Sequence, residues 1–264
     1  MQRRRDYPGL PTYQGGKTSK FNGAFAGITD IQGMDFYTAG CAPHVTSGIS
    51  KMRIQGAHDY LLNTRNNMKP GAVWGYSQFL CSDCWDVKAL SPGETTAQIA
   101  SVFAASNKGM MLFQTDYRSV SNPAWASSKA MFASFKPVKE LLRVGDKMQA
   151  GVTWSASPAQ VTVIQAPTAL VVIAVSWNAD GYNDLTCAIG FGAGAHWHFS
   201  ELKGLSATIQ LPAGFVPGNV QESTGSGLVP AKISASTSGS TLSLAEIDIG
   251  KDITARVFVV NRKV

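Results

Sequence analysis

The spacing of apolar and polar residues changes near residue 145 and divides the chain into two halves. In the first half, three apolar runs each end in polar or aromatic residues, at 28–37, 72–78 and 108–117. Stretches with the spacing of an amphipathic helix lie between and after these runs, at 49–66, 94–107, 124–135 and 137–143. Strands that alternate with helices in this way predict the βα units of a parallel sheet.

The second half contains short β-rich runs and little helical pattern. The runs are Gln160–Gln165, Ala169–Trp177, His196–Ser200, Ala207–Leu211, Ala231–Ser234, Thr241–Ile249 and Thr254–Val260. Turn-forming residues separate them, as in Ser238-Gly239-Ser240. About seven or eight short strands in roughly 115 residues predict an antiparallel β-sandwich. We therefore expect two domains, an α/β domain at 1–145 and an all-β domain at 146–264.

Composition narrows the classes of function. A hydrophobic content of 44% and a charged content of 15% are typical of a globular chain with a core. No apolar stretch reaches the roughly 18–20 residues that span a bilayer, so no membrane partner is expected. The net charge is +6, but the basic residues are scattered and form no nucleic-acid-binding module, which excludes nucleic acid as the expected partner. The segment Met1–Pro8 is basic and lacks the apolar core of a signal peptide, so either this export route is not used or the true N-terminus is missing, and localisation stays open.

Polar and aromatic residues follow the predicted strands of the first half, at the end where a parallel barrel forms its active-site mouth. They are Asp35 and Tyr37 on the first strand, Trp74, Tyr76 and Gln78 on the second, and Gln114 and Asp116 on the third. Asp35 and Asp116 are candidate catalytic carboxylates, with buried structural and helix-capping roles as the alternatives. Trp74, Tyr76 and Gln78 alternate along one strand and share a face, which fits either a substrate platform or core packing.

The cysteines raise the question of a metal site. The spacings Cys41-x2-His44 and Cys81-x2-Cys84 follow neighbouring predicted strands. A zinc site, a disulfide between loops and independent thiols all fit this pattern, and the three alternatives stay open. In His196–His198 the two histidines alternate along a predicted strand, but a third ligand is not evident. The sequence has no phosphate loop, nucleophile elbow or zincin motif, so we expect no cofactor and no metal.

The strand ends resemble those of TIM-barrel glycoside hydrolases. The segment Gly33–Tyr37 is similar to the D-x-Y strand end found late in such barrels, and Val73–Gln78 is similar to the strand that follows it. Residues 96–105 resemble the next helix, and Lys108–Gln114 resembles the last strand of the barrel. The resemblance covers about residues 20–145. It implies strands six to eight of a (β/α)8 barrel, a C-terminal β-sandwich and a carbohydrate partner.

The chain also departs from that family. Retaining glycosidases use two carboxylates about 5 Å apart. In many family members the nucleophile is a glutamate at the end of strand seven and the acid/base lies on strand four. The matching strand-seven position here is Gln78, no glutamate ends a predicted strand, and strand four is missing.

These departures predict a glycoside-hydrolase-like fragment without a complete catalytic carboxylate pair. We expect the isolated chain to be inactive as an enzyme. An open part of a barrel exposes strand edges, so further barrel residues or a second chain are expected to complete it. The alternative is a non-catalytic carbohydrate-binding or structural module.

Overall fold

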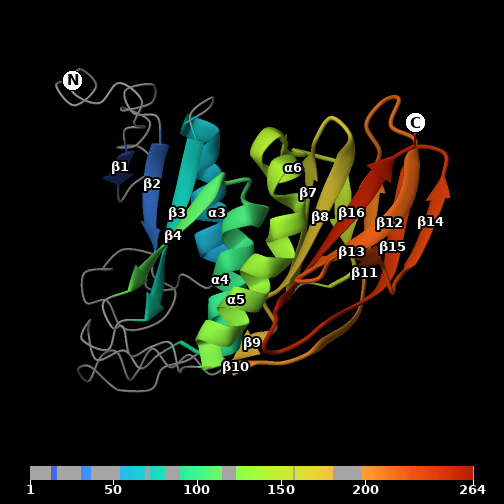
Figure 1. Ribbon diagram of the computed structural model, residues 1–264. Helices are drawn as coiled ribbons and strands as arrows, with labels where there is room; N and C mark the ends of the chain where they lie inside the picture. Colours follow the sequence, from blue (N-terminus) through green and yellow to red (C-terminus); the bar gives the residue numbers. More distant parts are fainter. Residues whose placement is uncertain are drawn as a thin grey trace.

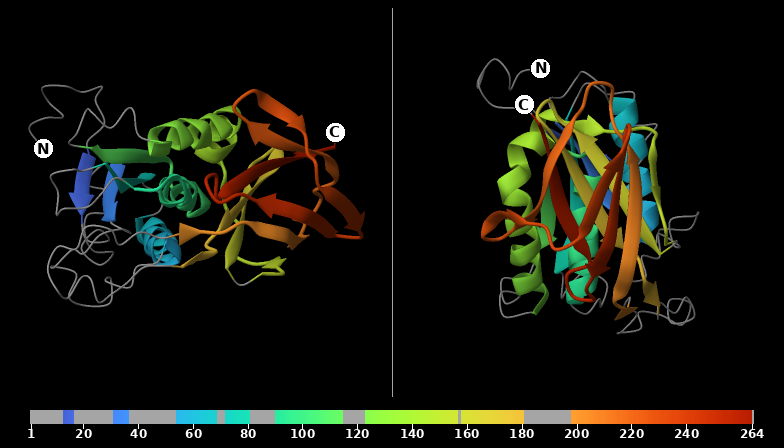
Figure 2. Two further views of the ribbon diagram at one scale, coloured as in Figure 1. Left: turned by 90° about the horizontal axis from the view of Figure 1, so that it is seen from below. Right: turned by 90° about the vertical axis from the view of Figure 1, so that its right-hand side faces the viewer.

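The computed structural model describes residues 13–16, 31–36, 54–68, 72–80, 90–114, 123–156, 158–180 and 198–263 of this chain. Within them, a parallel sheet, a layer of helices and two larger antiparallel sheets follow one another across the molecule (Figure 1). The view from below in Figure 2 shows the same succession. The fold is thus of mixed α/β class with several antiparallel sheets, which agrees with the coarse class predicted from the sequence.

The parallel sheet has four described strands in the order β1-β2-β3-β4. They are β1 (Tyr13–Gly16), β2 (Ile31–Phe36), β3 (Ala72–Leu80) and β4 (Gly109–Gln114). Each strand pairs in parallel with its neighbour. The last three match the predicted strands. The sequence pattern does not predict β1, because its four residues, Tyr-Gln-Gly-Gly, lack an apolar alternation.

Two helices cover one face of this sheet. They are α3 (Ile54–Met68), which lies between β2 and β3 in the chain, and α4 (Pro92–Ala104), which lies between β3 and β4. Val73 of β3 is fully buried in one cluster with Leu61 of α3 and Val102 of α4. This is the packing expected of βα units, in which each helix returns across the sheet.

The start of α4 is fixed by its own first turn. The Ser91 hydroxyl accepts a hydrogen bond from the Glu94 backbone N–H at 3.2 Å, and the Glu94 carboxylate accepts one from the Ser91 N–H at 2.7 Å. This capping box satisfies two backbone donors that a helix start otherwise leaves free. Pro92 occupies the first turn, where its fixed φ and missing N–H cost nothing.

The remaining helices lie between the parallel sheet and the antiparallel sheets (Figure 1). They are α5 (Pro123–Phe135), the 3-10 turn η2 (Lys136–Val138) and α6 (Lys139–Val144). Pro137 interrupts the helical hydrogen bonding between the stretches predicted at 124–135 and 137–143, because proline lacks the N–H that a continuous helix requires. The predicted boundary between residues 145 and 146 falls between α6 and β5.

After α6 the regular elements of the described chain are all strands, joined by turns and loops. The six-stranded sheet has the order β13-β12-β16-β8-β7-β5, the four-stranded sheet β14-β15-β11-β6, and a small sheet pairs β10 with β9. Their bounds are β5 (Asp146–Lys147), β6 (Val152–Trp154), β7 (Ala159–Gln165), β8 (Ala169–Ser176), β9 (Ala179–Asp180), β10 (His198–Phe199), β11 (Leu202–Gln210), β12 (Pro217–Thr224), β13 (Gly227–Pro230), β14 (Ser234–Ser238), β15 (Thr241–Ile249) and β16 (Ala255–Arg262). All described pairs in these sheets are antiparallel.

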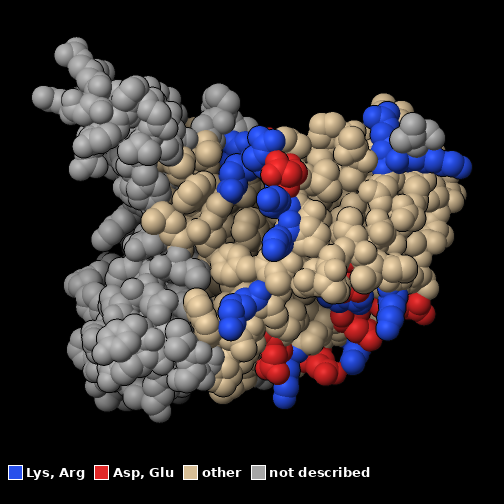
Figure 3. All heavy atoms as spheres, viewed as in Figure 1, with Lys and Arg blue, Asp and Glu red and all other residues tan. Residues whose placement is uncertain are grey.

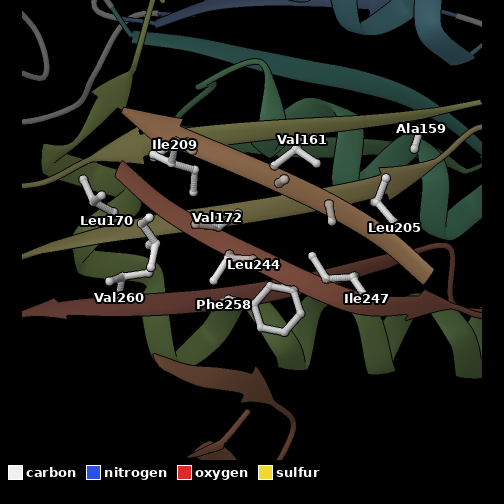
Figure 4. Packing of buried hydrophobic residues seen from close by; sticks show 14 of the residues in the cluster. Ala159, Val161, Leu170, Val172, Leu205, Ile209, Leu244, Ile247, Phe258 and Val260 are labelled. Atoms are coloured by element: carbon white, nitrogen blue, oxygen red, sulfur yellow. The ribbon is translucent and has the colours of Figure 1, made fainter. Parts of the chain in front are cut away.

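Three strands of the six-stranded sheet, β7, β8 and β16, are buried on both faces. On one face, Val172 and Phe258 pack with Leu205 and Leu244 of the four-stranded sheet (Figure 4). On the other face, alternate residues of the same strands cluster with residues of α4, α5 and α6. Every residue of β8 is therefore buried, and its sequence reads as a continuous apolar run instead of an alternating one.

Polar contacts also join α4 to the loop before β16. The Thr96 hydroxyl oxygen accepts a hydrogen bond from the Thr254 backbone N–H at 3.2 Å and lies 3.0 Å from the Thr254 hydroxyl. The helix start approaches this loop so closely that a Cβ on Gly93 would lie 2.5 Å from the Lys251 carbonyl oxygen. The two halves of the chain are thus held together by close packing and by buried hydrogen bonds.

None of the described helices is long and apolar enough to cross a membrane.

Candidate functional site

The backbone register brings the predicted strand ends to one edge of the parallel sheet. Asp35 of β2 lies opposite Tyr76 of β3, and Tyr76 lies opposite Met111 of β4. Further along, a register shift in β3 sets Leu80 opposite Gln114. Because the strands are parallel, all three run toward the same carboxyl edge, where β3 and β4 end together at Leu80 and Gln114 and β2 ends at Phe36, opposite Ser77. This is the edge at which ligands bind in parallel α/β folds.

Part of the predicted site can be followed only in the backbone. Asp35, Tyr76, Gln78 and Gln114 lie on the described strands β2, β3 and β4. Tyr37 and Asp116 lie outside the described residues. The assignment of these residues to substrate contact or catalysis therefore stays a prediction.

Trp74 is the one predicted site residue whose side chain is described. It is the third residue of β3, lies opposite Gly109 and is partly buried. A Cβ on Gly109 would lie 2.6 Å from its indole ring, so the ring rests directly on the backbone of β4. Its neighbour Val73 faces the helices, which puts Trp74 on the opposite face of the sheet. This contact near the start of β4 fits the packing alternative for Trp74 in the sequence analysis.

The glutamates lie away from the parallel strands. All five glutamates of the chain are described, and they are Glu94 in α4, Glu140 in α6, Glu201 before β11, Glu222 in β12 and Glu246 in β15. The arrangement of two glutamates that most retaining glycosidases use is therefore not found on the described strands of this sheet.

A buried polar cluster that the sequence analysis missed lies between α3 and β7. His58 is 1% exposed, and its ring nitrogens lie 2.9 Å from Asp59 Oδ1 and 3.1 Å from Gln160 Nε2. Burial lowers the pKa of His58 below its usual value near 6.5. His58 follows Ile54 by four residues and precedes Leu61 by three, so a polar residue on the apolar face of α3 was a signal available in the sequence.

Charged side chains gather along the lower edge of the antiparallel sheets (Figure 3). A groove of about 550 Å³ lies there, between α5, the turn after β12 and the loop before β16. Within it, Arg256 and Glu222 form a two-point ion pair, at 2.8 Å between Nε and Oε1 and 2.6 Å between Nη2 and Oε2. Since Arg256 and Glu222 neutralise each other, this ion pair has a structural character.

The metal alternatives of the sequence analysis are not tested by the described residues. Cys41, His44, Cys81 and Cys84 lie outside them, as does His196. Among the residues that are described, no group of three or more His, Cys, Asp or Glu side chains could hold a metal ion. His198 is exposed on β10, opposite Asp180 of β9.

Comparison with known proteins gives a likeness of structure. No protein-family model and no curated protein sequence matches the chain. Its fold is similar to that of a cycloisomaltooligosaccharide glucanotransferase from Paenibacillus sp., solved in complex with cycloisomaltoheptaose, with a TM-score of 0.58 and 8% identity over 94% of this chain and 55% of that chain. A weaker likeness is to a glycoside hydrolase family 30 xylanase from Clostridium papyrosolvens, with a TM-score of 0.46 and 8% identity over 89% of this chain and 49% of that chain. Another is to a family 30 xylanase from Clostridium acetobutylicum, with a TM-score of 0.43 and 10% identity over 96% of this chain and 56% of that chain.

The likeness to the glucanotransferase defines the class of fold. The chain has part of a glycoside-hydrolase-like fold, as the strand-end motifs predicted. It spans about half the length of the structures it resembles.

Proposed function

We propose that this chain is a carbohydrate-active part of a glycoside-hydrolase-like protein. In this proposal residues 1–145 correspond to the closing portion of a (β/α)8 barrel, residues 146–264 form its β-sandwich, and a saccharide binds at the carboxyl edge of the parallel sheet. The observation that carries the proposal is the register of that sheet, in which Asp35 lies opposite Tyr76 with the helices on the other face of β3. The likeness in fold to a glucanotransferase supports it.

Each residue type at this edge suits a saccharide. A carboxylate such as that of Asp35 accepts hydrogen bonds from sugar hydroxyls, and the amides of Gln78 and Gln114 both donate and accept them. Aromatic side chains such as Tyr37 and Tyr76 offer an apolar surface to the C–H face of a sugar ring. In the same proposal the Trp74 ring, which contacts Gly109 of β4, holds these aromatic side chains in place.

The positions of the glutamates favour a chain that binds a saccharide without hydrolysing it. Hydrolysis would require Asp35 and Asp116 to act as the carboxylate pair, in place of the usual glutamates. We therefore propose that the chain lacks a complete catalytic pair and that further barrel residues or a second chain complete the fold. The second candidate, a non-catalytic carbohydrate-binding module, rests on the same absence of glutamates from the described parallel strands.

The decisive experiment titrates the purified protein with oligosaccharides of xylose and of glucose by isothermal calorimetry, together with an assay for released reducing sugar. The variants are Asp35→Asn and Gln78→Ala, with Glu140→Gln on the exposed surface of α6 as the matched control. We expect each site variant to weaken binding by about tenfold, which corresponds to about 1.4 kcal/mol.

The outcomes separate the candidates. Binding with sugar release that is lost in Asp35→Asn assigns a hydrolase, whereas binding without release assigns a binding module. Equal affinity of the Asp35→Asn variant and the parent protein removes Asp35 from the site. Absence of binding to every oligosaccharide tested overturns the proposed function.

A further inference from the structure

His58 lies where the two halves of the chain meet. It is on α3, whose neighbours in the chain are β2 and β3 of the parallel sheet, and it contacts Gln160 of β7, a strand of the six-stranded sheet. The two residues are 102 positions apart in the sequence, so this contact holds elements from opposite halves together. The ring is 1% exposed and lies 6.0 Å from the Trp177 ring, between centroids.

The hydrogen bonds around the ring suit a neutral imidazole. The Gln160 amide nitrogen lies 3.1 Å from His58 Nε2 and 3.3 Å from Thr162 Oγ1. With its two hydrogens donated to these acceptors, the amide is fully used, and Nε2 must then carry no proton. His58 Nδ1 donates its proton to Asp59 Oδ1 at 2.9 Å, which completes the neutral tautomer.

A proton added to Nε2 disrupts this arrangement. The protonated Nε2 and the Gln160 amide nitrogen would both be donors, so the amide would have to turn its oxygen toward the ring and exchange the bond that it donates to Thr162 for one accepted from the Thr162 hydroxyl. The charged ring would also remain buried, which costs free energy unless it is paired. The contact between α3 and β7 therefore depends on the protonation of one side chain.

The charged groups around the ring oppose one another. Among the described residues these are Asp59 on α3, which favours the charged ring, and Lys147 on β5, which disfavours it. The Ala104 carbonyl at the end of α4 favours the charged form, while β7 and Trp177 present neutral groups. Asp59 is mostly exposed, so water screens its effect. Burial of the ring is the largest influence, and it lowers the pKa of His58.

We propose that His58 is a pH-sensitive latch between helix α3 and strand β7, closed when the ring is neutral and released when acid protonates it. A histidine whose pKa is lowered in the folded state stabilises that state above its unfolded pKa, which is about 6.5. This stabilisation is lost as the pH falls below that value. Release frees α3 from the antiparallel sheets and leaves the core between those sheets intact. The latch does not depend on the proposed saccharide site.

The test measures hydrogen exchange of the full chain by mass spectrometry at pH 7.5 and pH 5.5, corrected for the intrinsic exchange rate. For one group with an unfolded pKa of about 6.5, opening can become at most about tenfold more favourable over this range. We expect peptides from α3 to exchange up to about tenfold faster at pH 5.5, while peptides from β8 and β16 keep their protection. Few carboxylates titrate between these values, so the change reports on histidine.

Three variants assign the change to this histidine. His58→Gln keeps an acceptor for the Gln160 amide and cannot titrate, so its exchange should not depend on pH. His198→Gln removes an exposed histidine of β10 and should behave as the parent protein. Gln160→Glu sets a carboxylate against the ring, so acid should slow the opening of α3, and this variant tests the latch even where His58→Gln does not fold. Equal exchange of α3 at both pH values in the parent protein, or an unchanged pH dependence in His58→Gln, overturns the proposal.

Discussion

Arg256 of β16 and Glu222 of β12 form a two-point ion pair in which each side chain is only about one-fifth exposed. The side chains are 18% and 20% exposed, and the Arg256 guanidinium also lies 4.9 Å from the centre of the Phe258 ring. The ion pair therefore joins two neighbouring strands at the margin of the core. Partial exclusion of water makes such a pair stronger than one on the surface, and makes the loss of one partner more costly.

We predict that Glu222→Gln lowers the free energy of unfolding by about 1–3 kcal/mol, because it leaves a partly buried guanidinium without its counter-charge. Urea denaturation measures this change. The matched control is Glu140→Gln, which removes the exposed pair of Glu140 with Arg143 and should have little effect. In a double-mutant cycle with Arg256→Met, the two losses should sum to more than the loss in the double variant. Strictly additive losses would mean that the two side chains are not coupled.

Gly93 is predicted to tolerate no side chain. A Cβ at this position would lie 2.5 Å from the Lys251 carbonyl oxygen and 2.7 Å from the Phe199 ring. The carbonyl belongs to the backbone and cannot rotate away, so Gly93→Ala must displace α4 or the loop before β16. We expect a loss of about 1–3 kcal/mol in the free energy of unfolding, measured by thermal or urea denaturation.

Gly250→Ala is the control for that substitution. Gly250 lies on the same loop, and the nearest atom to an added Cβ is 3.7 Å away, at ordinary contact distance. Its stability should be unchanged or slightly raised, because alanine restricts the unfolded chain more than glycine. A Gly93→Ala protein as stable as the parent would show that α4 and the loop do not pack this closely at Gly93.

Thr96 tests the buried polar contact between the halves. Thr96→Val keeps the shape of the side chain but removes the acceptor of the Thr254 N–H, which is buried. An unsatisfied buried donor costs about 1–3 kcal/mol, and we expect that loss in urea denaturation. The control is Thr208→Val on the exposed side of β11, where valine suits a strand and stability should hardly change. Equal stability of the Thr96 and Thr208 variants would argue against the buried contact.

The sequence predicted best those elements whose burial follows a regular period. The run Thr241–Ile249 was predicted with the bounds of β15, because its buried residues alternate with exposed ones along much of the strand. The helix predicted at 94–107 is α4, which begins two residues earlier, at Pro92, after the Ser91 cap. Strands β6, β12 and β13 were missed, and the run predicted at Ala231–Ser234 meets β14 only at Ser234. The residues of β14 are all exposed, and β12 is polar, so neither has an apolar pattern to detect.

The candidate site was predictable only in part. Asp35 was expected at a strand end, and it is the second-last residue of β2. This could be predicted because the end of a strand follows from the local sequence pattern. The pairing of His58 with Gln160 was not predictable, since it depends on how α3 meets a strand that comes about a hundred residues later in the chain. The polar residue on the apolar face of α3 was visible in the sequence, but its partner is set by the packing of whole layers.

Strands β8 and β16 are buried on both faces, and this limits where the chain can be cut into separately folding pieces. Half of the side chains of β8 and β16 pack against helices that come earlier in the chain. A piece that began at residue 146 would carry that apolar face uncovered into water. Such faces attract other chains, so the piece would be prone to self-association. The smallest piece that keeps this core covered therefore includes the helices α4 to α6 along with the strands that follow them.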